Sequence, residues 1–205
     1  MDYNKLATKE TLDKTVSALK ERNIDAIVCA NKDEALSKIK EMIPDGASVN
    51  NGSSTTLQQL GFVDLLKSGN HKWINLKEEV VKETDPAKQA EARNKALFSQ
   101  YYLGSVHAVS EGGEVIIASA SGSQLPHLVF TSPNIIFVVS TKKICPDLNS
   151  GLERIRTHVV PLEDERMKSV GMGGTVLSKI LILEKEPAFM NRKVTMIFVE
   201  ENLGF

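Results

Sequence analysis

The feature that most constrains the fold is the alternation of short apolar runs with longer segments of amphipathic helical pattern. The runs at residues 24–30, 134–140 and 194–199 are short and rich in β-branched residues, which is typical of buried strands. Between them, residues 148–159 place apolar side chains on one face of a helix. Apolar strands that alternate with such helices predict a three-layer α/β/α fold with a mainly parallel (mixed) sheet covered on both faces.

A helical pattern over residues 5–22 precedes the first predicted strand. We therefore predict an N-terminal helical appendage at residues 1–22 and one α/β domain at residues 23–205. Within that domain we also expect strands at 47–50 and 73–76. A helix opened by Asp85 and Pro86 is expected to extend to about Tyr102.

Charge and composition exclude several classes of protein. The net charge is −1 and the basic residues are scattered, which argues against a dedicated nucleic-acid surface. No apolar run approaches the roughly 18 residues that would span a bilayer, and the N-terminus shows no signal-peptide pattern. The two cysteines are far apart in the sequence, so reduced thiols and a cytoplasmic location are expected.

The first candidate site follows the predicted strand at 47–50. Small polar residues occupy this loop and run into a helix at Leu57: Gly52, Ser53, Ser54, Thr55 and Thr56. Backbone N–H groups at a helix start, with hydroxyl donors beside them, favour an anion-binding loop. The alternative is an N-cap in a tight turn, since serine and threonine are common there. No lysine stands at the spacing of a Walker loop.

The second candidate is Glu111, in a hairpin that we predict over residues 105–122. It stands beside Gly112 and Gly113 at a strand end, where a partly desolvated carboxylate can act as a base or nucleophile. The alternative is a solvated turn residue, and Glu114 competes for the same role.

A third candidate loop follows the hairpin, at Ser121, Gly122 and Ser123. It lies between a predicted strand and a short helix at about residues 124–129, so the same anion-binding argument applies. We expect Ser54 and Glu111 to converge on one hollow at the rim of the sheet.

The remaining titratable residues give weaker signals. The histidines show no metal-ligand spacing, so no metal site is predicted; His107 faces either a cleft or the core. Cys145 precedes a helix start, which lowers a thiol pKa, but an inert thiol is the alternative. Arg154 and Arg156 are expected on the solvated side of their helix, with an anion clamp as the alternative.

Four segments together resemble a known family. They are SVHAVSEGGEVIIASASGSQLP, NIIFVVSTKKICPDLNSGLERIR, SKILILEKEP and MIFVEENLGF. In order and spacing, from about Ala26 onward, they resemble the LUD-domain family, the lactate-utilisation protein C group. The resemblance implies a fold like the NagB, ribose-5-phosphate isomerase and CoA-transferase superfamily (NagB/RpiA/CoA transferase-like). It also implies that residues 51–57 receive phosphate or CoA groups, and that Glu111-Gly112 is similar to the nucleophile of some CoA transferases.

The same resemblance implies oxidation of L-lactate to pyruvate alongside iron–sulfur partner proteins. Some relatives carry further cysteines after the helix at 148–159, whereas this chain has only Cys29 and Cys145. Two thiolates cannot hold a four-cysteine cluster, so iron–sulfur clusters are expected only in partners and no cofactor is expected in this chain.

Two functions therefore remain open, and a third is simpler. The chain is an accessory protein or subunit that works with iron–sulfur oxidoreductase subunits. Alternatively, it is a free-standing transferase- or isomerase-type enzyme for a phosphate- or CoA-bearing small anion, with Glu111 as the catalytic carboxylate. The third reading is a ligand-binding or scaffold protein without chemistry. Sheet proteins of this kind often form a homodimer.

Overall fold

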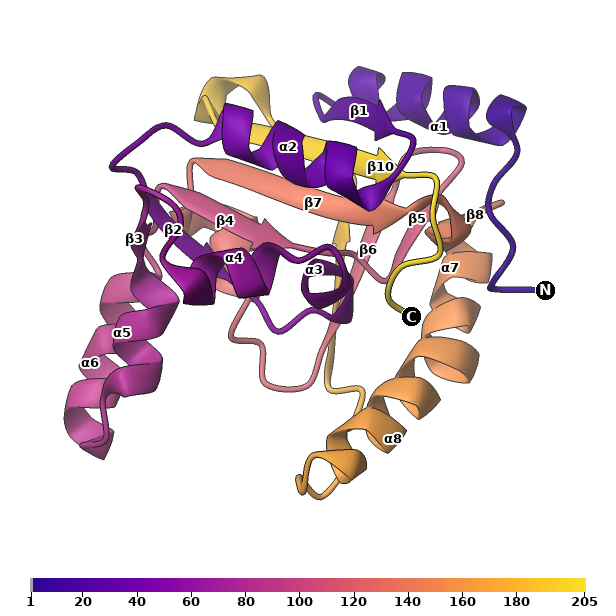
Figure 1. Cartoon of the computed structure of the whole chain (residues 1–205). Helices are drawn as coiled ribbons and strands as arrows, with labels where there is room; N and C mark the ends of the chain where they lie inside the picture. Colours follow the sequence, from indigo (N-terminus) through magenta and orange to yellow (C-terminus); the bar gives the residue numbers. More distant parts are fainter. Residues whose placement is uncertain (1) are drawn as a thin grey trace.

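A six-stranded sheet forms the centre of the computed structural model, which describes residues 2–205. Its strands lie in the order β1 (Asp25–Cys29), β10 (Lys193–Val199), β7 (Asn134–Ser140), β4 (Tyr101–Gly104), β2 (Ser48–Asn51) and β3 (Ile74–Asn75). Each neighbouring pair in this sheet is parallel. The carboxyl ends of the strands therefore share one edge, which we call the carboxyl edge (Figure 1).

Successive residues of a strand point to opposite faces of its sheet, and β7 supplies both faces. Ile136 and Val138 belong to one buried apolar cluster, and Ile135, Phe137 and Val139 belong to another. The first cluster is covered by α2 (Lys32–Met42), α3 (Thr55–Gln59) and α4 (Phe62–Ser68). The second is covered by α1 (Lys9–Glu21). The predicted three-layer architecture with a mainly parallel sheet is confirmed.

The sequence predicts an N-terminal appendage at residues 1–22, whereas α1 is an integral layer of the fold. Leu12 and Leu19 are fully buried in the second apolar cluster. Arg22, just after the helix, donates from Nε to the carbonyl of Gly112 at 2.7 Å and from Nη2 to Glu114 at 2.6 Å. Apolar burial and these contacts hold α1 against the sheet; Met1 lies outside the described residues.

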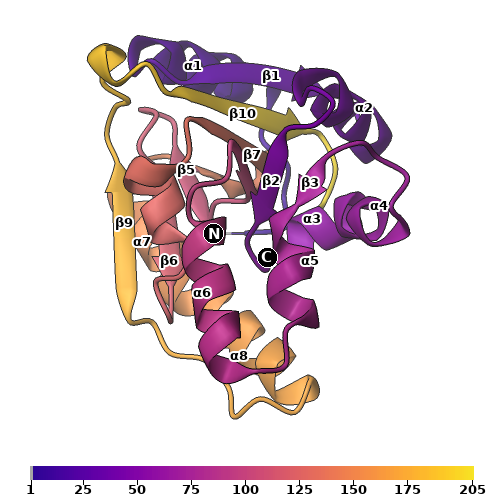
Figure 2. The same ribbon diagram turned by 90° about the vertical axis from the view of Figure 1, so that its left-hand side faces the viewer.

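A second, four-stranded sheet lies beside the first. Its order is β8 (Ile144–Cys145), β5 (Ala108–Ser110), β6 (Val115–Ser119) and β9 (Lys179–Leu183). The predicted hairpin is the antiparallel pair β5–β6. Figure 2 shows α7 (Leu148–Arg154) beside this sheet; the helix continues through a π-helical turn, η3 (Ile155–Val159), into α8 (Val160–Ser169).

The helix predicted from Asp85 to about Tyr102 is too long. In the structure α6 (Pro86–Ala96) ends at Ala96, and Tyr101 begins β4 in the middle of the main sheet. The helix lacks an apolar stripe, whereas Tyr102 and Leu103 are buried between β2 and β7. Burial of these side chains in the sheet outweighs local helix propensity.

The strand predicted at 73–76 is also shorter than expected. Only Ile74–Asn75 pair as β3, and α5 (Leu76–Lys82) follows directly, with Asn75 as its N-cap. Lys77 of α5 donates to the carbonyl of Asn51 at 3.0 Å, which anchors this helix at the end of β2. Short helical turns complete the fold: η1 (His127–Thr131), η2 (Thr141–Lys143) and η4 (Ala188–Met190). Within residues 2–205, none of the helices combines the length and apolarity required to cross a bilayer.

Candidate functional site

The carboxyl edge of the main sheet is where ligands bind in open α/β folds. All six strands end at this edge, and the candidate side chains lie on four of the segments that follow them: residues 52–54 after β2, 105–107 after β4, 141–143 after β7 and 200–205 after β10. The side chains on these segments decide what the edge can bind.

Lys143 is the most unusual side chain at this edge because its ammonium group is buried. Its Nζ donates to Thr56 Oγ1 at 3.0 Å, and to Ser105 Oγ and the carbonyl of Val106 at 3.1 Å each. These contacts join η2, the first turn of α3 and the end of β4. All three acceptors are uncharged, so they satisfy the donors of Lys143 without neutralising its charge.

The neighbours of Lys143 add positive charge. Lys142 and Arg154 are also buried, and none of the ion pairs found within residues 2–205 includes Lys142, Lys143 or Arg154. Burial, followed by the charges of Arg154 and Lys142, holds the pKa of Lys143 well below its usual value. A buried lysine with a depressed pKa binds an incoming anion or serves as a neutral amine.

The segment after β10 covers Lys143. The backbone N–H of Gly204 donates to Gln59 Oε1 at 2.6 Å, next to Thr56. A Cβ atom at Gly204 would lie 3.0 Å from Lys143 Nζ and would overlap Thr56 Oγ1. Only a glycine allows the chain to pass this close, so Gly204 covers Lys143 Nζ on this side.

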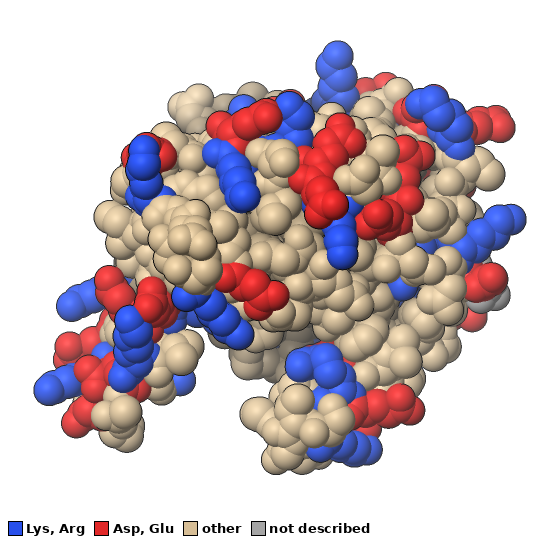
Figure 3. All heavy atoms as spheres, in the orientation of Figure 1, with Lys and Arg blue, Asp and Glu red and all other residues tan. Residues whose placement is uncertain are grey.

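The first and third candidate loops meet at Gly52. A Cβ atom there would lie 2.5 Å from the hydroxyl of Tyr102 and 3.4 Å from Gln124 Oε1. The Tyr102 hydroxyl is buried and has no hydrogen-bond partner among the described residues. In Figure 1 two parts of the molecule project downward as arms, one made of α5 and α6 and the other of α8, and the segment between β6 and η1 lies between them. The space-filling view shows a hollow between these two arms (Figure 3).

The ring of His127 packs against the ring of Tyr102. The two rings stack at 4.3 Å, and Asn50 Nδ2 lies 3.2 Å from His127 Nε2. With Asn50 donating to Nε2, the imidazole carries its proton on Nδ1, which lies 2.9 Å from Ser132 Oγ. Burial lowers the pKa of His127 to about 4, so the ring is neutral at pH 7 and positions Tyr102 without adding charge.

The predicted residues of the first loop have divided roles. Ser54 Oγ accepts from the N–H of Leu57 at 3.2 Å, which is the N-cap alternative. Thr56 binds Lys143, whereas Ser53 is exposed and Thr55 is half-buried. The loop therefore reaches the carboxyl edge through Gly52 and Thr56.

Glu111 lies elsewhere, at the β5–β6 turn. Its Oε2 is 2.8 Å from Lys14 Nζ of α1, and its N–H donates to the carbonyl of Cys145 at 2.8 Å. Since α1 covers one face of the sheet and α3 the other, the structure does not place Glu111 beside Ser54. The physical reason is that β5 and β6 leave the main sheet and pair with β8 and β9.

Gly112 and Gly113 serve the packing of α1. A Cβ atom at Gly113 would lie 2.8 Å from Cδ of Arg22, and the φ angle of Gly113 is +91°. The turn is thus closely filled by the Arg22 side chain.

The third candidate loop is held by its own hydroxyls. Ser119 Oγ accepts from the N–H of Gly122 at 2.9 Å, and Ser121 Oγ lies 3.0 Å from Ser123 Oγ. Ser121 and Ser123 are exposed, and Gln124 is the residue that reaches Gly52.

The two thiols are buried in different apolar clusters, Cys29 beside α2 and Cys145 beside α7. Burial raises the pKa of Cys145 to about 11, which corresponds to the inert-thiol alternative. Within residues 2–205, His, Cys, Asp and Glu side chains form no group of three that could hold a metal ion.

His107 occupies a structural position. Its Nδ1 accepts from the N–H of Ala118 at 3.0 Å, and burial followed by the charges of Lys143 and Arg154 lowers its pKa to about 3. The histidine therefore stays neutral and links β6 to the segment after β4.

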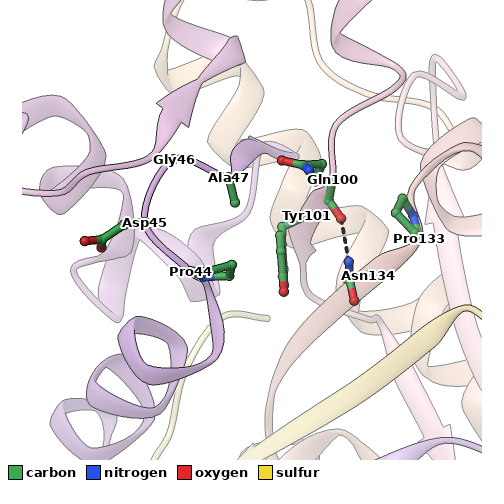
Figure 4. A pocket seen from close by; sticks show the side chains of 8 residues that line it. All are labelled: Pro44, Asp45, Gly46, Ala47, Gln100, Tyr101, Pro133 and Asn134. Atoms are coloured by element: carbon green, nitrogen blue, oxygen red, sulfur yellow. Dashed lines mark hydrogen bonds between the residues drawn. The ribbon is translucent and has the colours of Figure 1, made fainter.

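A hollow of about 360 Å³ lies at the opposite edge of the main sheet (Figure 4). It is lined by the turn at residues 44–47 and by the amino-terminal ends of β4 and β7. Its carboxylate, Asp45, pairs with Lys72 at 2.7 Å, and the Asn134 amide donates to the carbonyl of Gln100 at 3.0 Å. These polar groups are already paired, so this hollow is a weaker candidate than the carboxyl edge.

Sequence reasoning missed Lys143, Tyr102 and the burial of Arg154. The signal for Lys143 was present, because Lys142 and Lys143 follow the apolar strand at 134–140 after a single threonine. Tyr102 falls at the end of the helix predicted from Asp85, so its place in the main sheet is not apparent from the sequence. Arg154 was expected in solvent, yet it is fully buried, with Nη1 donating to the carbonyl of His107 at 2.6 Å.

Comparisons with known proteins agree with this architecture. No curated protein matches the sequence significantly. A crystal structure of a DUF162 family protein from Deinococcus radiodurans has a TM-score of 0.54 and 10% identity, and the match covers 95% of this chain and 99% of that one. At this identity the likeness shows a shared fold. A model of the LUD domain matches residues 12–196. The match spans most of the chain, which therefore belongs to the LUD-domain family, a family associated with lactate utilisation.

Proposed function

We propose that this chain is an accessory protein or subunit of an iron–sulfur-dependent system that oxidises L-lactate to pyruvate in the cytoplasm. The observation that carries the proposal is the family match over residues 12–196. The electron-transfer centres belong to partner subunits, since the two thiols of this chain are buried in separate clusters.

The chain contributes an anion-binding edge to this system. Lys143 places a protonatable amine beside the hydroxyls of Thr56 and Ser105, and none of these groups is matched by a carboxylate. A bound anion would favour the charged form of this amine. The carboxylate of a small hydroxy or oxo acid is the complement of such a site. Because Gly204 covers Lys143, binding is coupled to displacement of the segment after β10.

Affinity purification tests the partner role. A tagged chain is isolated from its source cells grown on L-lactate and, separately, on glucose. We expect iron–sulfur oxidoreductase subunits to copurify from the lactate-grown cells, and the isolated chain to oxidise no L-lactate with an artificial electron acceptor. Lactate oxidation by the chain alone, or purification without such subunits, would contradict the proposal.

The free-standing enzyme is less well supported by the geometry. Its catalytic carboxylate, Glu111, is paired with Lys14 and stands apart from Thr56 and Lys143. We therefore assign Glu111 to the attachment of α1.

A further inference from the structure

Arg154 is buried, and two of its three guanidinium nitrogens make no hydrogen bond within the described residues. Nη1 donates to the carbonyl of His107 at 2.6 Å. Nε and Nη2, which point together to the other side of the guanidinium, are buried and have no hydrogen-bond partner among residues 2–205. Buried donors are almost always paired, so this pair requires an explanation.

Another arginine of the same chain shows what such a pair binds. In α8, Arg166 donates from Nε and Nη2 to the two carboxylate oxygens of Glu163, at 2.7 and 2.5 Å. This two-bond geometry is the usual way in which arginine recognises a carboxylate. Arg154 presents the same two nitrogens, but within the described residues no carboxylate meets them.

The surroundings of Arg154 favour a negative ligand. Lys142 is buried nearby, and the Nε2 atom of His158 is buried and has no partner in the described chain. Burial, followed by the charges of Arg154 and Lys142, lowers the pKa of His158.

The N-terminal segment covers this group. The ring of Tyr3 lies 5.6 Å from Cζ of Arg154 and 5.0 Å from the ring of His158. Residues 2–7 contain no helix or strand, and Asn202 Nδ2 ties this segment to the chain by donating to the carbonyl of Asn4 at 3.0 Å. Figure 1 shows the segment passing the end of the molecule formed by β8 and α7.

We propose that Arg154, supported by Lys142 and His158, binds the carboxylate of a small organic anion, and that residues 2–7 form a cover that moves aside to admit it. This site lies under Tyr3 and next to the Lys143 contacts, since Arg154 donates to the carbonyl of His107 and Lys143 to that of Val106. It uses different donors from the Lys143 contacts and stands whether or not the chain acts in lactate oxidation.

The test uses the full chain, with L-lactate, acetate and phosphate as separate probes and sodium chloride as the ionic control. Binding is measured by calorimetry and by the ¹H–¹⁵N NMR signal of Arg154 Nε. We expect at least one carboxylate to bind and to shift this signal. A signal that moves with neither carboxylate, or with phosphate alone, would overturn the proposal.

Two variants and a control locate the site. Arg154→Lys keeps the charge but loses the paired donors, so carboxylate affinity should fall by about tenfold or more. Arg156→Lys, an exposed neighbour on the same helical segment, should bind as the wild type does. A well-folded Arg154→Lys variant with unchanged affinity would refute the assignment.

The second variant decides the question even if Arg154→Lys fails to fold. Tyr3→Ala leaves Arg154 intact and weakens the cover, so carboxylates should associate about tenfold faster. An unchanged association rate would refute the role of residues 2–7.

Discussion

Gly204→Ala tests whether the segment after β10 covers Lys143. Gly204 has a φ angle of +67°, in the left-handed region, where a side chain costs about 1–2 kcal/mol. The new Cβ atom would also lie 3.0 Å from Lys143 Nζ and overlap Thr56. If residues 204–205 stay in place over Lys143, the variant loses about 1–2 kcal/mol to the left-handed backbone and roughly 1–3 kcal/mol to overpacking.

Release of residues 204–205 avoids both costs. It loses the hydrogen bond to Gln59, about 0.5–1.5 kcal/mol, and the partial burial of Phe205, roughly 1 kcal/mol. We therefore expect the variant to be less stable by about 1–3 kcal/mol and its tail to be displaced. Since each 1.4 kcal/mol corresponds to about tenfold in an equilibrium, Lys143 should be exposed at least roughly tenfold more often.

Urea unfolding measures the stability, and mass spectrometry measures the acetylation rate of Lys143 by an amine-reactive acetyl ester. Gly69→Ala is the matched control, since Gly69 has a φ angle of +68° and no neighbouring atom within 4 Å of the new Cβ. This control should lose stability while Lys143 stays protected. Equal protection of Lys143 in both variants would refute the reasoning.

Four further predictions follow from individual side chains. Because the pKa of Lys143 is lowered in the folded state, the unfolded state binds its proton more readily. The free energy of unfolding of the wild type, relative to that of Lys143→Met, should therefore rise with pH up to about 10.4. If urea unfolding gives the same pH dependence for both proteins, the prediction is contradicted. Glu111→Gln should leave growth on L-lactate unchanged, whereas loss of growth would favour the catalytic alternative. Tyr102→Phe removes a buried hydroxyl without a partner, so thermal unfolding should show equal or higher stability; a loss above about 1 kcal/mol would reveal a missing partner. With its pKa raised to about 11, Cys145 should resist iodoacetamide at pH 8 in the folded chain, and rapid alkylation would argue for a reactive thiol.

Periodicity predicted most of the fold because the apolar runs of β7 and β10 are buried on both faces and read clearly as strands, and the shorter run of β1 pairs with β10 at the edge of the sheet. It failed at β4, where Tyr102 follows a helix closely and only its sheet neighbours decide its conformation. The candidate loops at 52–56 and 121–123 were predicted from their small residues, and in the structure Gln124, just after the second loop, approaches Gly52.

For the charged part of the site, the sequence shows that lysines follow a buried strand but does not show that they are buried. A lysine after a strand is usually solvated, and nothing local shows that Thr56 and Ser105 enclose Lys143. Glu111 looked like a site residue because a carboxylate beside glycines marks a strand end. Its pairing with Lys14 depends on where α1 packs, which is a long-range property.

Growth on L-lactate as the sole carbon source tests the central claim most directly. Source cells that lack this chain should fail to grow on L-lactate, grow normally on glucose, and recover when the wild-type chain is restored. Normal growth on L-lactate without the chain would contradict the account.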